Sequence, residues 1–488
     1  MNLSGLLAAL RPLPGYPATL TALMGDQAAS HGLALNLPRA ARAPFAAALA
    51  GEASRDAPRP ILVISARPDR ALTLVEEIGA WSNDLRVLQF NEPNPVFYEP
   101  AAWGARITRA RIAVLSALAS LASPFLTNPN SAQAFPLVII TSARALMTRT
   151  LPRREFLIQT RTLKVGQTVR LEKLIEAWVE IGYSAESIVV EPGQFSRRGG
   201  LLDIYPMADE LPARIELFGD EIETLRRFDP AQQRSGEKIE ALTITPAREG
   251  LPKFSKAEGR STRQKDESAN EATSSLTFPL SSLEFQIPLM YPPASLIEYL
   301  PEQALVLVDD WQELADIVGE LEEHAVQQRG EQMEAGLLAE DFPVPYLTWS
   351  ELQDELAGRP LGVLSARADE DGPTLPLGAN FQPGPRFGGQ LKPVLEHLQT
   401  IHASGEQAVV VSRQAQRLAE LWSERNTPVR VTENIKAPPA PGEMVFVEGA
   451  LSDGWVLKAE GRSARLKDEA AGAEAGIGPG SMCSTMKY

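Results

Sequence analysis

The sequence predicts an α/β protein in which a parallel-sheet domain carries an inserted α+β module and is followed by a separate small α/β domain. Three observations support this prediction. Short, fully apolar segments alternate with amphipathic segments in residues 1–155 and 279–357, and the alternation returns in 380–457. Such alternation is typical of a parallel sheet covered by helices on both faces. Residues 156–247 instead contain one helical segment and then short segments between turn residues, which is typical of a small antiparallel sheet.

Length, composition and charge limit the functions that the chain can have. At ~150 residues per domain, its length corresponds to about three domains, and 44% hydrophobic with 22% charged residues excludes fibrous and wholly disordered chains. The net charge of −15 disfavours tight DNA binding by the chain as a whole. The single cysteine, Cys483, excludes an internal disulfide and a zinc site. No stretch approaches the ~18 apolar residues of a membrane span, so we expect a cytoplasmic protein without membrane contact.

In the parallel-sheet domain, buried strands and helices follow each other along the chain. The apolar runs predict strands at 61–64, 87–90 and 136–142, and the amphipathic runs predict helices at 72–81 and 107–121. Beyond the inserted module, the pattern predicts a strand at 305–308 and a helix at 311–323. Either Asp309 or Asp310 is a suitable N-cap for that helix.

The inserted module begins with a strongly amphipathic helix. Its apolar residues recur at i, i+3, i+4, i+7 and i+8, and they are Leu171, Leu174, Ile175, Trp178 and Val179. Gly182 follows and ends the helix. Segments 188–190, 199–206 and 213–218 then predict strands that pack on this helix.

The remaining segments are linkers and a second α/β unit. Residues 248–278 are rich in Lys, Glu, Ser, Arg and Thr, which predicts a flexible insertion, and Pro and Gly predict a linker at 358–379. The final domain, 380–457, is predicted to contain helices at 391–401 and 415–425 and strands at 409–412, 429–431 and 444–447. Residues 458–488 lack periodicity, and we expect a disordered or aberrant tail.

The motifs of common enzyme sites are missing from the sequence. No Gly-x-x-x-x-Gly-Lys-Ser/Thr phosphate loop occurs, and residues 33–45 have neither a glycine pair nor a lysine where such a loop is expected. Residues 308–310, Val-Asp-Asp, imitate a magnesium-binding strand end but are better explained as a strand leading into a helix cap. The histidines are scattered, at His31, His324, His397 and His402. We therefore predict no catalytic, cofactor-binding or metal-ligating residues.

Basic residues concentrate once, between 143 and 174, where eight Lys or Arg face two acids. Such a run suits either a solvated surface or a contact with DNA phosphates. Phe156 is the single aromatic residue of the run, so no series of aromatic residues interleaves to stack on bases. We therefore interpret the run as solvated surface and keep DNA contact as an alternative.

One stretch is far more specific than these patterns. It comprises 193–206, GQFSRRGGLLDIYP, then 211–229, LPARIELFGDEIETLRRFD, and 232–235, QQRS. It strongly resembles the module shared by the excision-repair protein UvrB and the bacterial transcription-repair coupling factors (Mfd). UvrB keeps a phosphate loop and a long aromatic hairpin, and this chain has neither, so the resemblance is to the N-terminal part of Mfd. The resemblance implies a degenerate UvrB-like parallel-sheet domain with an inserted UvrA-binding module.

The same resemblance implies which parts of the family's activity this chain has. Polymerase-interacting and ATP-driven translocase modules were not found in the sequence, so contacts with RNA polymerase and DNA, and the need for ATP and magnesium, are expected only in a missing C-terminal part. The tail departs from the family pattern, which favours a truncated or frame-shifted product or a fragment. We expect a non-catalytic adaptor that needs no cofactor and recruits UvrA.

The candidate binding residues are Arg198, Arg214 and Phe218, the positions to which the family resemblance assigns the UvrA contact. Arg198 precedes a glycine pair, and Arg214 and Phe218 share one strand face by the period-two rule. Two guanidinium forks around an aromatic anchor are the usual composition of a binding hot spot. The alternative is structural: Arg214 could pair with Glu216 or with a neighbouring strand, and Phe218 could be core. A rival from another class is a UvrB-type ATPase or DNA-loading subunit of the excision nuclease.

Overall fold

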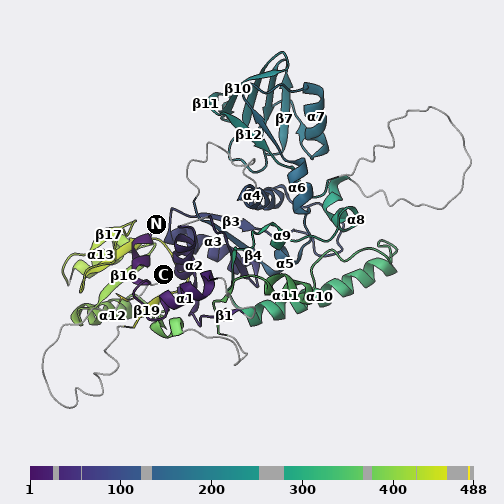
Figure 1. Ribbon diagram of the computed structural model, residues 1–488. Helices are drawn as coiled ribbons and strands as arrows, with labels where there is room; N and C mark the ends of the chain where they lie inside the picture. The colour runs from purple at the N-terminus through teal and green to yellow at the C-terminus, as the bar shows by residue number, and fades with distance from the viewer. Residues whose placement is uncertain are drawn as a thin grey trace, which may run out of the picture.

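A computed structural model describes residues 1–25, 32–55, 58–121, 135–251, 280–366, 376–388, 390–424, 426–458 and 482–483. Figure 1 shows three parts: a parallel-sheet domain at the centre, the inserted module above it and the C-terminal domain beside it. Most of the predicted flexible insertion (248–278) and of the predicted tail (458–488) lies outside the described residues. Among the described residues, no helix combines the length and the apolar character needed to cross a membrane.

The central sheet is parallel throughout, with the strand order β1-β14-β13-β2-β4-β3. The strands are β1 (Leu33–Ala34), β2 (Ile61–Ser65), β3 (Arg86–Phe90), β4 (Leu137–Ser142), β13 (Leu305–Val308) and β14 (Leu361–Val363). Every residue of β2, β4 and β13 is buried, because helices cover both faces of the sheet. This confirms the parallel sheet predicted from the apolar runs.

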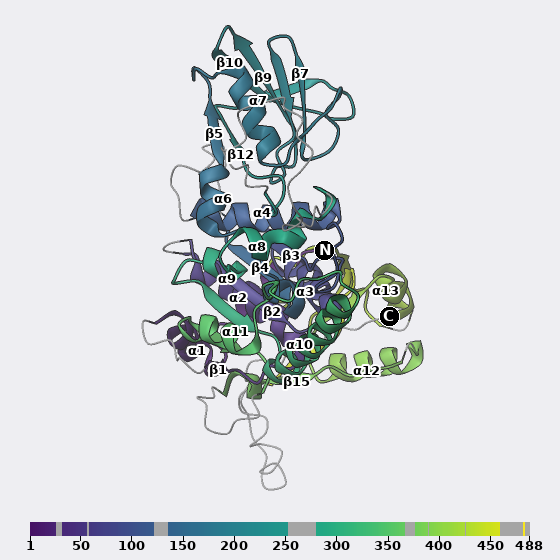
Figure 2. The same cartoon turned by 90° about the vertical axis from the view of Figure 1, so that its right-hand side faces the viewer.

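The helices of this domain lie on the two faces and at the carboxyl ends of the strands (Figures 1 and 2). They are η1 (Ser4–Ala9), α1 (Tyr16–Met24), α2 (Arg39–Ala53), α3 (Pro68–Trp81), α4 (Ala105–Leu121), α5 (Ala143–Met147), α6 (Arg153–Gln159), η3 (Leu280–Gln286), α8 (Ile287–Met290), α9 (Leu296–Tyr299), α10 (Trp311–Glu334) and α11 (Trp349–Ala357). The Asp310 side chain accepts a hydrogen bond from the Glu313 amide and caps α10. The predicted end of this helix at 323 was wrong, since α10 continues to Glu334.

The inserted module has a twisted sheet with the order β11-β10-β9-β8-β7-β6 and a separate pair, β12-β5. Its elements are β5 (Arg161–Lys164), α7 (Leu171–Glu180), β6 (Ser184–Ala185), β7 (Gln194–Arg198), β8 (Leu201–Ile204), β9 (Ala213–Phe218), β10 (Glu221–Phe228), β11 (Ser235–Lys238) and β12 (Ala241–Ile244). Helix α7 packs on one face of the sheet, where Trp178 meets Phe195 edge to face with ring centroids 5.4 Å apart. The strand predicted at 188–190 is absent from this described part of the chain, because those residues form an irregular segment from which Val189 alone is fully buried.

The C-terminal domain has its own sheet, in the order β15-β19-β20-β16-β18-β17. Its elements are η4 (Pro376–Asn380), β15 (Phe381–Pro383), α12 (Leu391–Ala403), β16 (Gln407–Ser412), α13 (Ala415–Ser423), β17 (Arg430–Thr432), β18 (Met444–Glu448), β19 (Trp455–Leu457) and β20 (Met482–Cys483). Trp455 stacks on Trp81 of α3 with ring centroids 6.2 Å apart. This domain therefore shares buried apolar contacts with the parallel-sheet domain.

A buried ion pair joins the module to the parallel-sheet domain. The guanidinium of Arg111, on α4, donates two hydrogen bonds to the carboxylate of Glu249, which follows β12. Both side chains are fully buried, and the Thr150 hydroxyl also donates to Glu249. The guanidinium lies 3.9 Å from the Phe90 ring centroid and 4.7 Å from that of Trp103.

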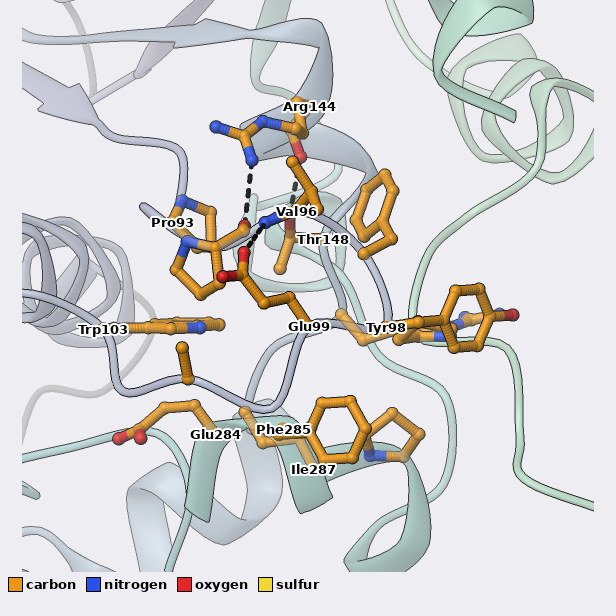
Figure 3. A pocket seen from close by; sticks show the side chains of 16 residues that line it. Pro93, Val96, Tyr98, Glu99, Trp103, Arg144, Thr148, Glu284, Phe285 and Ile287 are labelled. Carbon is orange, nitrogen blue, oxygen red and sulfur yellow. Dashed lines mark hydrogen bonds between the residues drawn. The ribbon is translucent and has the colours of Figure 1, made fainter. Parts of the chain in front are cut away.

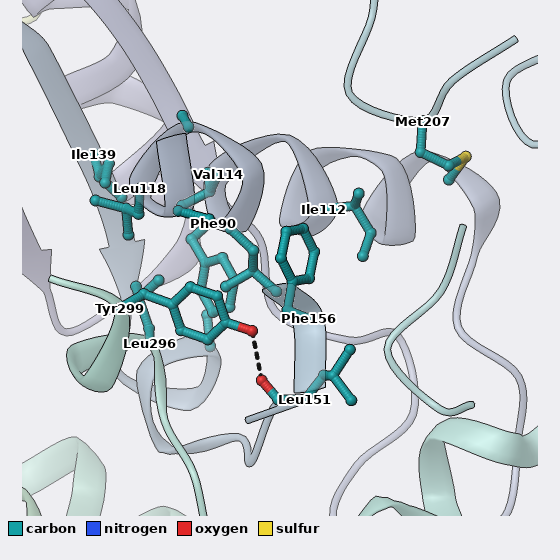
Figure 4. Packing of buried hydrophobic residues seen from close by; sticks show 14 of the residues in the cluster. Phe90, Ile112, Val114, Leu118, Ile139, Leu151, Phe156, Met207, Leu296 and Tyr299 are labelled. Carbon is teal, nitrogen blue, oxygen red and sulfur yellow. Dashed lines mark hydrogen bonds between the residues drawn. The ribbon is translucent and has the colours of Figure 1, made fainter. Parts of the chain in front are cut away.

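Apolar packing continues from this joint into both parts of the protein (Figure 4). Phe156 of α6 meets Tyr299 edge to face, and the Tyr299 hydroxyl donates to the Leu151 carbonyl at 2.6 Å. Met207 of the module belongs to the same buried cluster as Ile112 of α4. The module therefore packs against the parallel-sheet domain through buried apolar contacts, in addition to being joined to it by the chain.

Candidate functional site

Two tight hairpins place the predicted residues at one end of the module. Arg198 pairs with Leu201 across the Gly199-Gly200 turn, and Phe218 pairs with Glu221 across the Gly219-Asp220 turn. Both turns need glycine at their first central position, where φ is +63° at Gly199 and +61° at Gly219. Strands β7 and β9 each run antiparallel to β8, so the two turns lie at the same end of the sheet.

This end of the module points away from the parallel-sheet domain. Strand β5 enters the module from that domain, and the segment after β5 reaches the second turn, where the Val169 amide donates to the Asp220 carbonyl at 2.7 Å. Figure 1 shows the module standing above α4 and α6, with β10 toward its far end. The hairpin end is thus the part of the module furthest from the joint.

Cross-strand pairing puts all three predicted residues on the same face. Arg198 lies opposite Leu201, which lies opposite Glu216, and Asp203 lies opposite Arg214. Directly opposed residues share a face of a sheet, and so do residues two apart on one strand. Arg198, Arg214 and Phe218 therefore lie on the face turned away from α7, which we call the outward face.

Phe218 is the most exposed large apolar side chain of the described residues, with 79% of its surface accessible. Its neighbour Leu217 points to the other face and packs against the core. Of these two neighbours, Phe218 is therefore the exposed one, and the alternative that Phe218 is core is wrong. A phenyl ring exposed to water at the end of a strand, beside a two-residue turn, is suited to fill an apolar pocket of another protein.

Arg198 is also exposed, and its guanidinium is nearly free. Among the residues that the structure describes, its one hydrogen-bond partner is the Ser187 carbonyl, at 3.1 Å from Nη2. The Ser196 hydroxyl donates to the same carbonyl at 3.1 Å and supports this contact from beneath. Most of the five N–H donors of Arg198 are therefore available to a carboxylate.

Arg214 differs, because its guanidinium is already engaged within the module. Nε and Nη2 donate to the two carboxylate oxygens of Asp203 at 2.8 and 2.9 Å, and Nη1 donates to the Ser235 hydroxyl at 3.1 Å. The guanidinium carbon lies 4.9 Å from the ring centroid of Phe228. The hydrogen bonds to Asp203 raise the pKa of Arg214. Arg214 thus pairs with a neighbouring strand and not with Glu216, which accepts a hydrogen bond from Thr224.

Two contributors to this face were not among the predicted binding residues. Leu201 is partly exposed and lies opposite Arg198, and Phe228 forms the floor beneath Arg214. The alternation along β8 would have placed Leu201 on the face of Asp203. The partnership of Phe228 with Arg214 depends on the register of β9 against β10, which sequence patterns do not report.

Two arginines of the predicted basic run are paired with acids inside the fold. Arg144 of the basic run donates to Glu92 at 2.7 Å, and Arg149 donates to Glu351 at 3.2 Å. These two arginines of the run are thus neutralised by acids. The alternative that the run contacts DNA would therefore depend on its other six basic residues.

The carboxylate of Asp309, in the predicted strand end at 308–310, is paired with two arginines. Asp309 is buried and accepts from Arg70 at 3.0 and 3.2 Å, and Arg42 lies 3.2 Å from the same carboxylate. Burial raises the pKa of Asp309, but the hydrogen bonds from Arg70 and the charge of Arg42 outweigh it, and the net pKa is lowered. The described residues contain no group of His, Cys, Asp and Glu that could hold a metal ion.

A pocket near the carboxyl ends of β3 and β4 is lined mainly by prolines and aromatic rings, including Trp103, Tyr98 and Phe285 (Figure 3). Its charged groups are engaged: Arg144 donates to the Pro95 carbonyl, and Glu99 accepts from the Val96 amide. Glu284, at the rim, forms a bidentate pair with Arg248. The pocket therefore offers apolar contact surface, and we assign it no catalytic role.

Comparison with known proteins agrees with the sequence resemblance. The family model described as the UvrB interaction domain matches residues 162–249. The transcription-repair-coupling factor of Bacillus subtilis (strain 168) is 24% identical over 454 residues, which cover 87% of this chain and 37% of that protein. The factor of Staphylococcus aureus (strain Mu50) is 26% identical over 329 residues, which cover 61% of this chain and 27% of that protein.

The match therefore spans 37% of the length of the first relative and 27% of the length of the second. The matched interaction domain contains Arg198, Arg214 and Phe218 and both hairpin turns. The prediction that this chain resembles the transcription-repair coupling factors is confirmed. Residues 162–249 thus match the model of the UvrB interaction domain, and the chain as a whole is similar, over most of its length, to transcription-repair-coupling factors.

Proposed function

We propose that this chain is the non-catalytic N-terminal region of a transcription-repair coupling factor, and that its module recruits UvrA in transcription-coupled nucleotide excision repair. The observation that carries the proposal is the exposed Phe218 ring at the end of β9, on the same face as the accessible guanidinium of Arg198. Aromatic and arginine side chains dominate the binding energy of protein interfaces. A partner that suits this face has an apolar pocket next to a carboxylate.

In this proposal the parallel-sheet domain is a scaffold that needs no cofactor. Support comes from the strand end at Asp309, where Arg42 and Arg70 neutralise the carboxylate that would otherwise be available to a magnesium ion. The motor activity of the parent protein, an ATP-dependent DNA translocase, would depend on ATP and magnesium bound elsewhere. Its contacts with RNA polymerase and DNA would likewise belong to regions beyond those described above.

The proposal is tested by measuring the affinity of the purified chain for a bacterial UvrA by titration calorimetry. We expect Phe218→Ala and Arg198→Ala each to weaken binding by roughly 30-fold, which corresponds to about 2 kcal/mol at a hot spot. Unfolding curves should show that both variants remain folded.

Matched controls lie on the other face of the module. Val179 is an apolar residue of α7 with 51% of its surface accessible, and Arg197 precedes Arg198 but lies opposite the buried Leu202. Val179→Ala and Arg197→Ala should bind UvrA as the wild type does. If the wild-type chain fails to bind UvrA, or if the two test variants bind as the controls do, the proposal is wrong.

A further inference from the structure

The two arginines of the outward face, Arg198 and Arg214, differ in how many of their N–H donors remain available to a partner. Arg214 has five N–H donors. Nε and Nη2 are committed to Asp203, and Nη1 is committed to Ser235 with the Gln233 carbonyl 3.5 Å away. Bidentate recognition of a partner carboxylate needs two parallel donors, and in Arg214 the parallel pair already holds Asp203. Arg198 has no such internal partner in the part of the chain that the structure describes.

Breaking the internal pair to free Arg214 would be costly. The Asp203 side chain is only 4% exposed, whereas that of Arg214 is 15% exposed. A buried carboxylate that loses its cation is left uncompensated in a poorly solvated site. A partner that took over Arg214 would have to offset this cost, so the pair should persist in the complex.

The pair also connects most of the strands that form the outward face. Asp203 belongs to β8, Arg214 to β9, Phe228 beneath the guanidinium to β10, and Ser235 to β11. The adjoining turn is held by Gln233, whose side-chain amide donates to the Val189 and Pro230 carbonyls at 3.0 and 2.8 Å. Arg214 is therefore placed to fix the curvature of the face on which Arg198 and Phe218 are displayed.

We propose that Arg214 is a positioning residue for docking, which acts through Asp203 and Phe228 to hold the outward face in shape, while Arg198 is the arginine that meets the partner's carboxylate. The proposal rests on the UvrA-binding function proposed above. It assigns Asp203 a part in docking although its side chain is buried.

A double-mutant cycle between positions 203 and 214 tests this assignment, with binding to UvrA as the readout. Asp203→Ala, Arg214→Ala and the double variant should each weaken binding by a similar factor, about 5- to 10-fold, because each removes the same internal pair. The charge-swapped variant, Asp203→Arg with Arg214→Asp, should recover part of the loss. If Arg214 instead gripped the partner, Asp203→Ala would bind as tightly as the wild type, and the swap would not recover binding.

The salt dependence of binding provides a readout that a purely structural change does not move. Arg198→Ala should reduce the slope of log Kd against log salt concentration, because it removes a charge pair from the interface, whereas Arg214→Ala should leave the wild-type slope unchanged. A reduced slope for Arg214→Ala overturns the assignment. Arg214→Lys, which keeps the charge but loses the planar fork, should also bind weakly with an unchanged slope.

The outcomes separate this inference from the proposed function. If Arg198→Ala and Phe218→Ala weaken binding while Asp203→Ala does not, the docking function stands and the positioning role is wrong. If none of these variants changes the affinity, the docking surface itself is wrong. No binding by the wild-type chain overturns both.

Discussion

The arginines of the parallel-sheet domain and those of the module's outward face are used in opposite ways. Arg70 and Arg111 are buried, and each holds a buried carboxylate through two hydrogen bonds. Arg198 is exposed and keeps most of its donors free. Arg214 is intermediate, since its side chain is 15% exposed although the Asp203 side chain that it holds is 4% exposed. The comparison shows that the place of an arginine in a binding motif is not enough to make it a binding residue. Its guanidinium must also have N–H donors that no carboxylate within the fold already occupies.

The largest effect is expected at the joint between the module and the parallel-sheet domain. Arg111→Met leaves the Glu249 carboxylate buried without its cation, which should lower the free energy of unfolding by about 3–5 kcal/mol. The double variant Arg111→Met with Glu249→Met should recover most of this loss. Urea denaturation measures both values. If the single and double variants lost the same free energy of unfolding, the cost would not come from leaving the Glu249 carboxylate without its cation, and this account of the pair would be wrong.

A smaller effect is expected at the carboxyl end of β13. Asp309→Asn weakens the charge-assisted hydrogen bonds from Arg70 and should cost about 2 kcal/mol at neutral pH. Because the folded-state pKa of Asp309 is lowered, its contribution is complete above the unfolded value of about 3.9 and is lost as pH falls through the folded value. The difference between wild type and variant should therefore shrink in acid. A constant difference from pH 7 to the acid range would contradict this account.

The smallest effect on stability is expected on the outward face. Arg198→Ala should change the free energy of unfolding by less than about 0.5 kcal/mol, as is usual for exposed positions, although it is predicted to weaken UvrA binding strongly. Thermal or urea unfolding of the same protein batches used for binding measures this. A stability loss comparable to that of Asp309→Asn would remove the contrast between the two groups of arginines.

Much of the fold was predictable because its core strands are unusually apolar. Strands β2, β4 and β13 are buried on both faces, and helix α7 shows its apolar stripe clearly. The segment 188–190 misled the prediction, since its β-branched residues imitate a strand while Ile188 and Val190 are half exposed. The extra turns of α10 are mostly polar and carry side-chain contacts such as Gln327 with Glu331, so no apolar pattern marks them.

The candidate site was predictable in position but not in chemistry. The period-two rule placed Arg214 and Phe218 on one face, and the glycine pair marked the turn after Arg198. The sequence pattern could not show that Asp203 occupies the Arg214 fork, because that contact depends on the register of β8 against β9. Long-range register is set by packing of the whole sheet and not by the local sequence.

The joint at Arg111 and Glu249 has a mechanical consequence for anything bound at Phe218. A swivel at this point would pull a matched pair of charges apart in a dry site, so the module resists rotation about its base. A partner bound at Phe218 would therefore keep a fixed orientation relative to the parallel-sheet domain.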